Sequence, residues 1–375
     1  MGVQGCHVVL IKGRGRVHLA HLRLRDFRNY RFLDQDFPPG FQLILGDNAQ
    51  GKTNILESVY LLTTLRSFRG VGGGQMIRHG QSGYFVGGRV VSEGEQELSL
   101  YWSPSTRQIS VHPEPVRTLN EFLCCLRAMV FCTEDLQLVK GAARIRRRFV
   151  DLILSQTDAA YLPLLQRYAR TLRSGNALLK RVPADPLVLE GFSRELVQCG
   201  DQIMKARQRL LPKVSALARL AYRRISHDAE ELQIRYEPNV KADFRLELNR
   251  SREREQRYRA TVVGPHRDDV GLLLDDRGGA QYGSEGQKRS MAISLKMAQA
   301  EYLTGMVGVP PVLLIDDVMG ELDVKRRSGL LPLLERSHQA RGQVFMTCTE
   351  ENLPRELGRR LHRWRVAEGG LSALA

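Results

Sequence analysis

The chain has 375 residues, of which 42% are hydrophobic and 26% charged, and this globular composition excludes the disordered and fibrous classes. Lysine and arginine number 56 against 41 acidic residues, so the formal net charge of +15 favours a polyanionic partner. No apolar run approaches the roughly 18 residues of a membrane span, and the six cysteines show no paired C-x-x-C spacing. We therefore expect two to three domain-sized units in a cytoplasmic protein with no membrane partner.

The first third of the chain predicts sheet and one strand, loop and helix unit. Residues 17–27 alternate apolar and polar positions, which is the period of a half-buried strand. The short apolar run 41–45 is followed by a glycine-bearing loop and then by the helical sequence 54–62. Many glycines and several alternating stretches between residues 70 and 115 suggest antiparallel strands.

The middle of the chain predicts long helices. From residue 135 to about 228 the apolar period becomes helical, with a break near 182–186. Apolar residues recur every three or four positions between Phe192 and Ile225, which is one stripe on a helix, and Pro212 should kink it. Two helices of some 30 to 40 residues, at 1.5 Å per residue, would form a projecting hairpin.

Strand patterns return at residues 232–236 and 270–274. We therefore predict a helical arm inserted into an α/β domain. The expected boundaries give an N-terminal head part over 1–134, a helical arm over 135–255 and a C-terminal head part over 256–375.

A phosphate-binding loop is predicted at residues 46–53, because Gly-Asp-Asn-Ala-Gln-Gly-Lys-Thr fits G-x-x-x-x-G-K-[ST] between a strand and a helix. In such a loop the backbone amides and the helix N-terminus surround phosphate oxygens. Lys52 would reach the β- and γ-phosphates, and the Thr53 hydroxyl would ligate Mg²⁺. The predicted phosphate-binding residues are Gly46, Asp47, Asn48, Ala49, Gln50, Gly51, Lys52 and Thr53.

A second motif is the apolar run 312–315, which ends in Asp316 and Asp317. Asp316 would hold the Mg²⁺ shell, while Asp317 would orient or deprotonate an attacking water. A strand that simply ends in a polar turn is the alternative interpretation. The separation of about 260 residues from the loop, and the absence of N-K-x-D, disfavour a GTPase.

A third motif, Ser284-Glu285-Gly286-Gln287, opens a helix-forming sequence. Serine and glycine at a helix N-terminus form an anion site. Because the first loop already surrounds phosphates, the natural use of this site is to face the γ-phosphate of a partner subunit. The alternative interpretation is an ordinary N-cap at Ser284.

The order of these motifs, followed by Glu321-Leu322-Asp323, resembles the ABC-type ATPases of the SMC class. Further segments resemble the RecF family of recombination and repair proteins, and the resemblance extends from about residue 17 nearly to the C-terminus. The segments that carry it are 26–30, 46–57, 66–69, 139–141, 146–151, 264–269 and 316–323.

The resemblance implies an α/β ABC/SMC-type P-loop ATPase head with an inserted helical arm, and ATP with Mg²⁺ as cofactors. It also implies an ATP-dependent homodimer, binding to duplex or gapped DNA, and slow DNA-stimulated hydrolysis that ends binding. RecO-like and RecR-like partners would help this protein to load the RecA recombinase.

Carried over to this sequence, the resemblance makes Lys52 and Asp317 catalytic. Ser284, Gly286 and Gln287 would contact the nucleotide in trans, and Asp323 would line the dimer interface together with Ser284. Glu285 and Gly320 depart from the family pattern. No counterpart is assigned for the glutamine loop near 131–135 or for the switch histidine near 347–349. Because Asp317 is one methylene shorter than glutamate, we expect slow turnover.

Arg144, Arg146, Arg147 and Arg148 form a tight basic run, predicted to contact DNA phosphates. A solvated surface is the alternative for this run and for the looser one at 250–259. His266 and Arg267 have no predicted role beyond a turn. Two rival functions are left open: a transporter-coupled nucleotide-binding domain, and a scaffold that holds ATP and DNA but scarcely hydrolyses.

Overall fold

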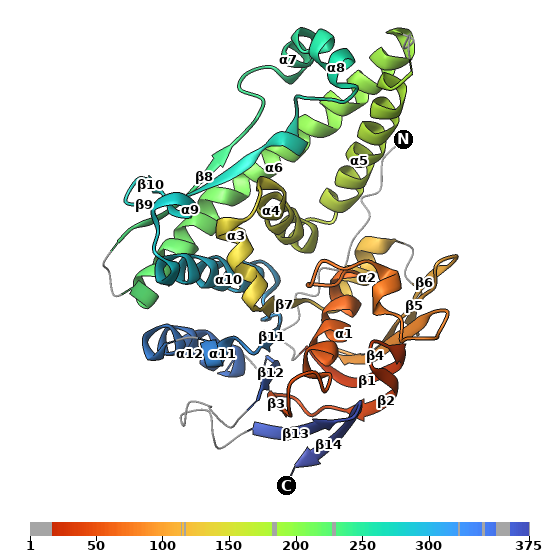
Figure 1. Ribbon diagram of the computed structural model, residues 1–375, viewed down its shortest axis with the longest axis vertical. Coiled ribbons are helices and arrows are strands. Elements are labelled where there is room, and N and C mark those ends of the chain that lie inside the picture. Colours follow the sequence, from red (N-terminus) through yellow and green to blue (C-terminus); the bar gives the residue numbers. More distant parts are fainter. Residues whose placement is uncertain are drawn as a thin grey trace. The chain divides into compact units, whose positions relative to one another are not determined.

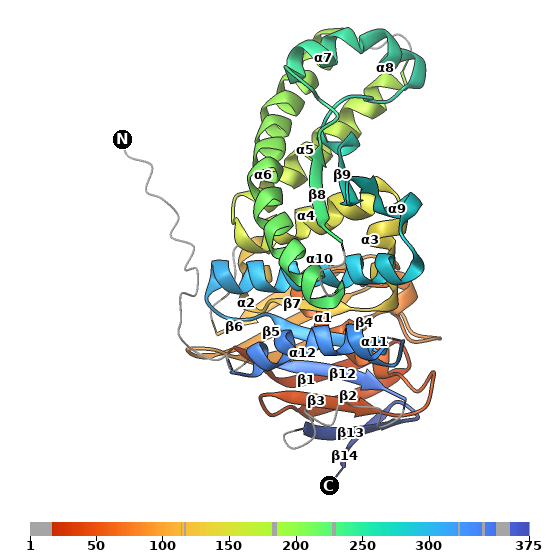
Figure 2. The ribbon, with the colours of Figure 1, turned by 90° about the vertical axis from the view of Figure 1, so that its left-hand side faces the viewer.

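Figures 1 and 2 show the computed structural model, in which residues 17–113, 115, 118–181, 186–226, 230–321, 323–339, 342–349 and 361–374 are described. The chain divides into two compact units. Unit 1 contains the residues up to Asp135 together with Gln299 onward, and unit 2 is Leu136–Ala298. The first sixteen residues, and most of the predicted break at 182–186, lie outside the described part.

Unit 1 contains a six-stranded sheet in which β14 is antiparallel and the other strands run parallel. Its strands, in spatial order, are β14 (Gly370–Leu374), β13 (Leu361–Ala367), β3 (Phe41–Leu45), β12 (Val344–Cys348), β11 (Val312–Asp316) and β7 (Ala128–Phe131). Strands β3 and β12 are buried along their whole length, as expected for strands inside a parallel sheet. Because β3, β12 and β11 are neighbours that run parallel, their carboxyl ends lie at one edge of the sheet.

A second, five-stranded antiparallel sheet completes the strands of unit 1. Its order is β2 (Tyr30–Asp36), β1 (His18–Phe27), β4 (Tyr84–Val91), β5 (Glu95–Trp102) and β6 (Arg107–His112). This confirms the predicted antiparallel strands. Helix α1 (Lys52–Thr64) contacts strands of both sheets, and most of its residues are buried. That position explains why its sequence is apolar around most of the helix.

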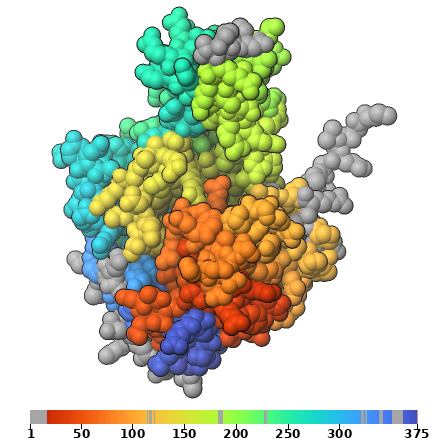
Figure 3. Space-filling view, turned by 45° about the vertical axis from the view of Figure 1, so that its right-hand side comes forward, coloured from red at the N-terminus to blue at the C-terminus, as the bar shows by residue number. Residues whose placement is uncertain are grey.

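The remaining helices of unit 1 are short or peripheral. They are η1 (Gly73–Met76), α2 (Leu119–Cys125), α11 (Val318–Glu321) and α12 (Val324–Gln339). A short 3-10 helix, η2 (Thr133–Leu136), ends at the boundary with unit 2, and α10 (Glu285–Val307) begins in unit 2 and ends in unit 1. Figure 3 shows the C-terminal strands, in blue, at the surface beside N-terminal strands in red, in agreement with contacts between β14 and β2.

Unit 2 is mainly helical. Its helices before the sheet are α3 (Gln137–Lys140), α4 (Ala143–Thr157), α5 (Tyr161–Leu179) and α6 (Pro186–Ser226). Helices α5 and α6 pack side by side (Figure 1), and Pro212 lies inside α6. None of the helices in the described residues is both long and apolar enough to cross a bilayer.

The expectation of two helices of 30 to 40 residues is wrong for the first of them. Helix α6 has 41 residues, but α5 has only 19. The helical conformation is interrupted between α4 and α5, where the Asp158 carboxylate accepts the Ala160 N–H at 2.9 Å. Pro163 follows in the first turn of α5, the part of a helix where a missing N–H is tolerated.

The second unit extends beyond the predicted arm boundary at residue 255. Strand β8 (Leu232–Glu237) pairs with β9 (Asp269–Leu274) along its full length, and β10 (Arg277–Gly278) completes a three-stranded sheet. Between them lie α7 (Phe244–Arg250), α8 (Arg252–Tyr258) and η3 (Pro265–Arg267), and α9 (Gly279–Tyr282) follows. Residues 256–298, expected in the head, therefore belong to unit 2, because strand pairing connects them to β8.

Candidate nucleotide-binding site

The predicted phosphate-binding loop joins β3 to α1, as the sequence motif requires. Two of its glycines are needed for its path. Gly46 has φ +154, and a Cβ there would lie 2.5 Å from the Val366 carbonyl oxygen. Gly51 has φ +115 and is the N-cap of α1. The loop therefore approaches β13 more closely than a larger residue would allow.

Lys52 bends back over this loop. Its buried Nζ donates to the carbonyl oxygen of Gly46 at 2.7 Å and to that of Asp47 at 2.9 Å. An ammonium group donates three hydrogen bonds and accepts none, so it is suited to hold oxygens that converge on the loop. The amides at the N-terminus of α1 add positive potential at the same place.

The loop is fixed from outside by residues of the resemblance motif 26–30 and by the C-terminal strands. Asn29 Nδ2 donates to the Gln50 carbonyl oxygen at 2.7 Å, and the Tyr30 hydroxyl donates to the Gly51 carbonyl oxygen at 3.1 Å. The Glu368 N–H donates to Gln50 Oε1 at 2.8 Å. These bonds hold the loop without using the side chain of Lys52.

A buried carboxylate on α1 connects two further motif segments. Glu57 is fully buried and accepts both Nε and Nη2 of Arg28 at 2.7 Å. The Ser67 hydroxyl also donates to Glu57, and the Arg69 Nη1 lies 4.0 Å from it. Arg69 Nη1 also donates to Asn54 Oδ1 at 3.2 Å. Segments 26–30 and 66–69 therefore meet at Glu57.

A pair of oxygen ligands suitable for Mg²⁺ lies beside the loop. The Thr53 hydroxyl donates to Asp316 Oδ1 at 2.8 Å, although the two residues are 263 positions apart. Burial raises the pKa of the Asp316 carboxyl, and hydrogen bonds from Thr53 and Thr347 oppose that rise. A hydroxyl and a carboxylate are hard oxygen ligands, and Mg²⁺ in nucleotide sites takes few protein ligands besides phosphate and water. The residues present therefore fit this ion.

Thr347 is a site residue that no sequence motif indicates. It lies on β12, between the strands that carry the loop and Asp316. Its Oγ1 lies 3.0 Å from Asp316 Oδ1 and accepts the Asp317 N–H at 3.0 Å. Asp317 has φ +53, a left-handed conformation that is uncommon outside glycine. The only sequence signal was the position of Thr347 at the end of a buried strand.

The predicted signature residues Ser284, Gly286 and Gln287 lie in unit 2, at the start of α10. Ser284 is exposed; its N–H donates to Gln287 Oε1 at 2.5 Å, and the Gln287 N–H donates to Ser284 Oγ at 3.2 Å. This is a reciprocal N-terminal cap. Lys140 Nζ forms an ion pair at 2.5 Å with Glu285, the residue that differs from the family pattern. Ser284 is therefore an N-cap, as the alternative interpretation expects, and its contact to a nucleotide stays a prediction.

Asp323, the other predicted interface residue, caps α12. Its exposed carboxylate accepts the Arg326 N–H at 2.9 Å and pairs with the Arg326 guanidinium. Its place in a dimer interface also stays a prediction.

Two of the four arginines predicted to contact DNA are engaged inside unit 2. Arg146 donates from Nε and Nη2 to the two carboxylate oxygens of Asp269, both at 2.8 Å, and from Nη1 to the Gly141 carbonyl oxygen at 2.7 Å. Arg147 donates to the Asp268 carbonyl oxygen at 2.5 Å, and burial lowers its pKa. Arg144 and Arg148 are exposed. Two arginines of the basic run therefore pack inside unit 2, and the other two are exposed at the surface.

The segment 264–269 is the centre of a buried polar network. Asp268 is 1% exposed and accepts hydrogen bonds from Arg207 at 2.9 Å and from the Tyr236 hydroxyl at 2.5 Å. His266 pairs with the Tyr168 hydroxyl at 2.7 Å and with the Thr261 carbonyl oxygen at 3.1 Å. Burial lowers the pKa of His266 to about 4, so the ring is neutral at pH 7. Its role is therefore to order the interior of unit 2.

The chain has the fold of a P-loop ATPase of the ABC/SMC type. The loop lies between β3 and α1, and Asp316 ends a parallel strand of the same sheet. An SMC head domain from Pyrococcus furiosus has the same fold, with a TM-score of 0.56, 14% identity and coverage of 96% of each chain. No family model matches the sequence.

Other known proteins are more similar to this chain than that SMC head domain is. A DNA replication and repair protein RecF from Symbiobacterium thermophilum is 36% identical over 348 residues, which cover 89% of this chain and 92% of the relative. RecF from Lactobacillus johnsonii is 34% identical over 95% of this chain and 99% of its own. A solved RecF–ATP structure, described as a recombination mediator of the RecFOR pathway, has a TM-score of 0.87 and 29% identity, and covers 96% of this chain and 98% of its own. The chain belongs to the RecF family of DNA replication and repair proteins.

Proposed function

We propose that this protein is an ATP-dependent DNA-binding protein of recombinational repair, in which two copies close around ATP and slow hydrolysis releases them. The observation that carries the proposal is the 2.8 Å bond between Thr53 and Asp316, since it brings the loop and the acidic strand end together. Membership of the RecF family and a solved relative described with ATP support the same nucleotide.

Within one copy, each residue of the loop has a distinct part. The amides of the loop and the Lys52 ammonium would bind the β- and γ-phosphates, in place of the carbonyl oxygens that Lys52 now contacts. Thr53 and Asp316 would hold Mg²⁺, which when bound neutralises phosphate charge. Raising the pKa of Asp316 makes its carboxylate a stronger base for a cation, while the two hydroxyl donors keep it oriented.

Asp317 would accept the proton of the attacking water. Thr347 fixes the backbone of Asp317 through the 3.0 Å bond from its N–H, so the carboxylate projects from a rigid position. A shorter side chain than glutamate reaches less far toward a water molecule, and a base that is less well placed slows the chemical step. Slow hydrolysis suits a protein that must remain on DNA before release.

Completion of the site would require a second copy. Ser284 is exposed at the N-terminus of a 23-residue helix, where backbone amides and the helix dipole favour an anion. Ser284, Gly286 and Gln287 of one copy would face the γ-phosphate held by the other, and Asp323 would lie at the interface. The net charge of +15 suits DNA binding through phosphates. RecR-like and RecO-like partners, with which the protein would load RecA, are part of this proposal, and membership of the RecF family supports them.

The test is the association state with and without MgATP, measured by sedimentation velocity. We expect wild type to dimerise on ATP, Lys52→Ala to lose ATP binding, and Ser284→Arg to bind ATP but stay monomeric. Gln281→Arg, an exposed position near the same helix, is the control and should dimerise. An ATP-bound Ser284→Arg variant that dimerises like wild type would contradict the proposal.

A further inference from the structure

The side chain of Gln287, at the start of α10, is bonded at both ends of its amide group. Its Oε1 accepts the Ser284 N–H at 2.5 Å, and its Nε2 donates to the Glu230 carboxylate. An N–H group can only donate and an ionised carboxylate can only accept, so a flipped amide would lose both bonds. Glu230 therefore fixes which end of the Gln287 amide faces Ser284.

Glu230 is itself held from two sides within unit 2. The hydroxyl of Tyr222, a buried residue of α6, donates to Glu230 Oε2 at 2.7 Å. The N–H of the next residue, Glu231, donates to Asp275 Oδ1 at 2.9 Å, and its carbonyl oxygen accepts the Asp275 N–H at 3.1 Å. Glu230 is therefore an acceptor in a fixed position, although it lies 57 residues before Gln287.

The hydrogen bonds continue from Gln287 to the Ser284 hydroxyl. The Gln287 N–H donates to Ser284 Oγ at 3.2 Å, which uses a lone pair of that oxygen. Among the residues that the structure describes, none accepts the hydrogen of this hydroxyl. The hydroxyl of Ser284 is therefore held by its oxygen, and its hydrogen can be donated outward to a phosphate oxygen.

The acidic residue inside the motif, Glu285, is engaged differently. It forms ion pairs with Lys140 at 2.5 Å and with Lys288 at 3.5 Å, so its charge is offset by two cations. Glu230 accepts from neutral donors instead, one of which is the Gln287 amide. A hydrogen bond to an ionised acceptor is roughly twice as strong as one between neutral groups. The contact with Glu230 is therefore strong enough to orient Gln287.

We infer that Glu230 is a positioning residue for the contact between Ser284 and the nucleotide of the partner copy, an inference that rests on the function proposed above. Glu230 orients Gln287, and Gln287 holds both the backbone and the hydroxyl of Ser284. Glu230 acts through Gln287 and not on the nucleotide itself. Without Glu230 the amide of Gln287 can turn over, which places an N–H against the Ser284 N–H and releases Ser284 from its fixed position.

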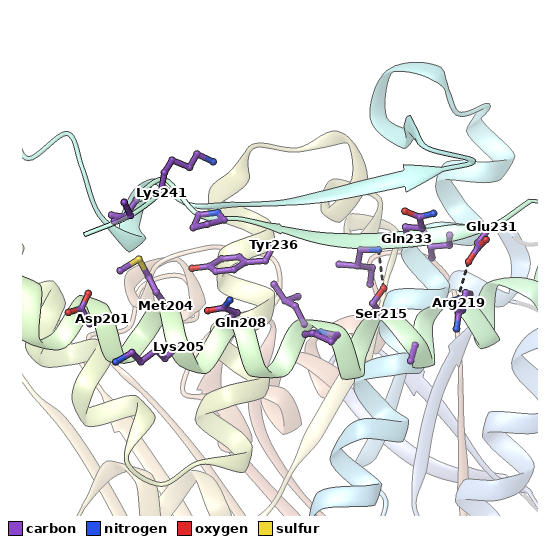
Figure 4. A pocket seen from close by; sticks show the side chains of 18 residues that line it. Asp201, Met204, Lys205, Gln208, Ser215, Arg219, Glu231, Gln233, Tyr236 and Lys241 are labelled. Carbon is purple, nitrogen blue, oxygen red and sulfur yellow. Dashed lines mark hydrogen bonds and ion pairs between the residues drawn. The ribbon is translucent and has the colours of Figure 1, made fainter. Parts of the chain in front are cut away.

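The first test measures the Kd of the ATP-dependent dimer by sedimentation velocity of the full-length protein with MgATP. Glu230→Ala frees the Gln287 amide, and we expect the dimer Kd to rise at least about tenfold. Glu230→Gln still accepts from Gln287 and should stay within about threefold of wild type. Glu231→Ala is the matched control, because Glu231 pairs with Arg219 at 3.1 Å instead (Figure 4), and it should dimerise like wild type.

An exchange of the two side chains tests the orientation directly. Gln287→Glu puts two carboxylates together, and we expect the dimer Kd to rise at least about tenfold. In the double variant Glu230→Gln/Gln287→Glu, the amide at position 230 donates to the carboxylate at position 287, which still accepts the Ser284 N–H. The double variant should therefore return to within about threefold of wild type. A general loss of stability in unit 2 would not be reversed by this exchange.

A second measurement does not depend on dimerisation. Without ATP, amide hydrogen exchange at Ser284 should be at least about threefold faster in Glu230→Ala than in wild type, because the acceptor of this N–H is no longer fixed. Equal exchange, a Glu230→Ala dimer as tight as wild type, or a double variant no tighter than Gln287→Glu would overturn the inference and leave the proposed function intact. A wild type that stays monomeric with MgATP would contradict the proposed function, and the exchange measurement then decides whether Glu230 positions Ser284.

Discussion

Thr347 Oγ1 lies 3.0 Å from Asp316 Oδ1 and also accepts the N–H of the next residue. One hydroxyl on β12 thus holds the proposed metal ligand and the backbone of the proposed base. Because β12 lies between β3 and β11, this hydroxyl also occupies the position between the loop strand and the acidic strand.

Thr347→Val removes that hydroxyl while keeping the shape of the side chain. The Asp317 N–H loses its acceptor, which costs roughly 1–3 kcal/mol if it is left unpaired, and Asp316 loses one of the donors that lower its pKa. We expect single-turnover ATP hydrolysis to fall at least about tenfold, with ATP affinity changed less than about threefold. Thr347→Ser keeps the hydroxyl and should hydrolyse like wild type. Equal rates for the valine and serine variants would exclude this role.

Asp317→Asn tests the proposed base directly. Asparagine keeps the size of the side chain but cannot accept a proton from water, so hydrolysis should fall by about 10²–10⁴-fold. ATP binding should remain, and the ATP-dependent dimer should last longer. Dimer lifetime can be followed by dilution and light scattering after MgATP addition. Brisk hydrolysis by this variant would show that another group takes the proton.

Arg144 and Arg146 should behave differently in DNA binding although they are two residues apart. Arg144 is exposed, so Arg144→Ala should weaken duplex binding and reduce the slope of log K against log salt by about 1, if it contacts a phosphate. Arg146 binds Asp269 with two hydrogen bonds, and Arg146→Ala should instead lower the free energy of unfolding by about 1–3 kcal/mol. Salt titrations of DNA binding and urea unfolding of both variants separate the two effects. A normal unfolding curve for Arg146→Ala would contradict its structural role.

His266 should make stability depend on pH. Its pKa is lowered by burial to about 4 in the folded protein and is near 6.5 when unfolded. Between these values the unfolded chain binds more protons, so stability is fully present above pH 6.5 and is lost as the pH falls toward 4. The loss is at most about 3 kcal/mol. His266→Asn cannot titrate and should show a flatter profile in urea unfolding across this range.

The comparison must be made between the two proteins at each pH, because another buried group acts in the opposite direction. Burial raises the pKa of Glu255 to about 7, so its contribution falls as the pH rises from about 4.5 to 7. That contribution is common to wild type and variant and cancels in their difference. Parallel pH profiles for the two proteins would show that His266 does not titrate as described.

Local patterns were sufficient to predict the loop and the acidic strand end. The residue types of the motif at residues 46–53 determine the backbone conformation of the loop, and the apolar run before Asp316 indicates a buried strand. Strand alternation likewise predicted the antiparallel sheet. The meeting of Thr53 with Asp316 followed from the parallel strands, since their carboxyl ends share one edge.

Features that depend on distant pairing were not predictable from single segments. Thr347 becomes a site residue only because β12 lies between β3 and β11. His266 gains its role from Tyr168, 98 positions earlier. The end of the arm was placed too early because nothing local in residues 256–298 indicates that β9 pairs with β8. For the same reason, the break after Asp158 was not separated from the surrounding helical pattern.

The last strands of the chain close on the first loop. Strand β3 lies between β12 and β13, Gly46 approaches Val366, and Gln50 is bonded by Glu368. During synthesis, the loop therefore lacks these neighbours until residues 361–368 have been made. A nascent chain arrested before residue 361 has neither β13 nor β14, and it cannot form the finished nucleotide-binding loop.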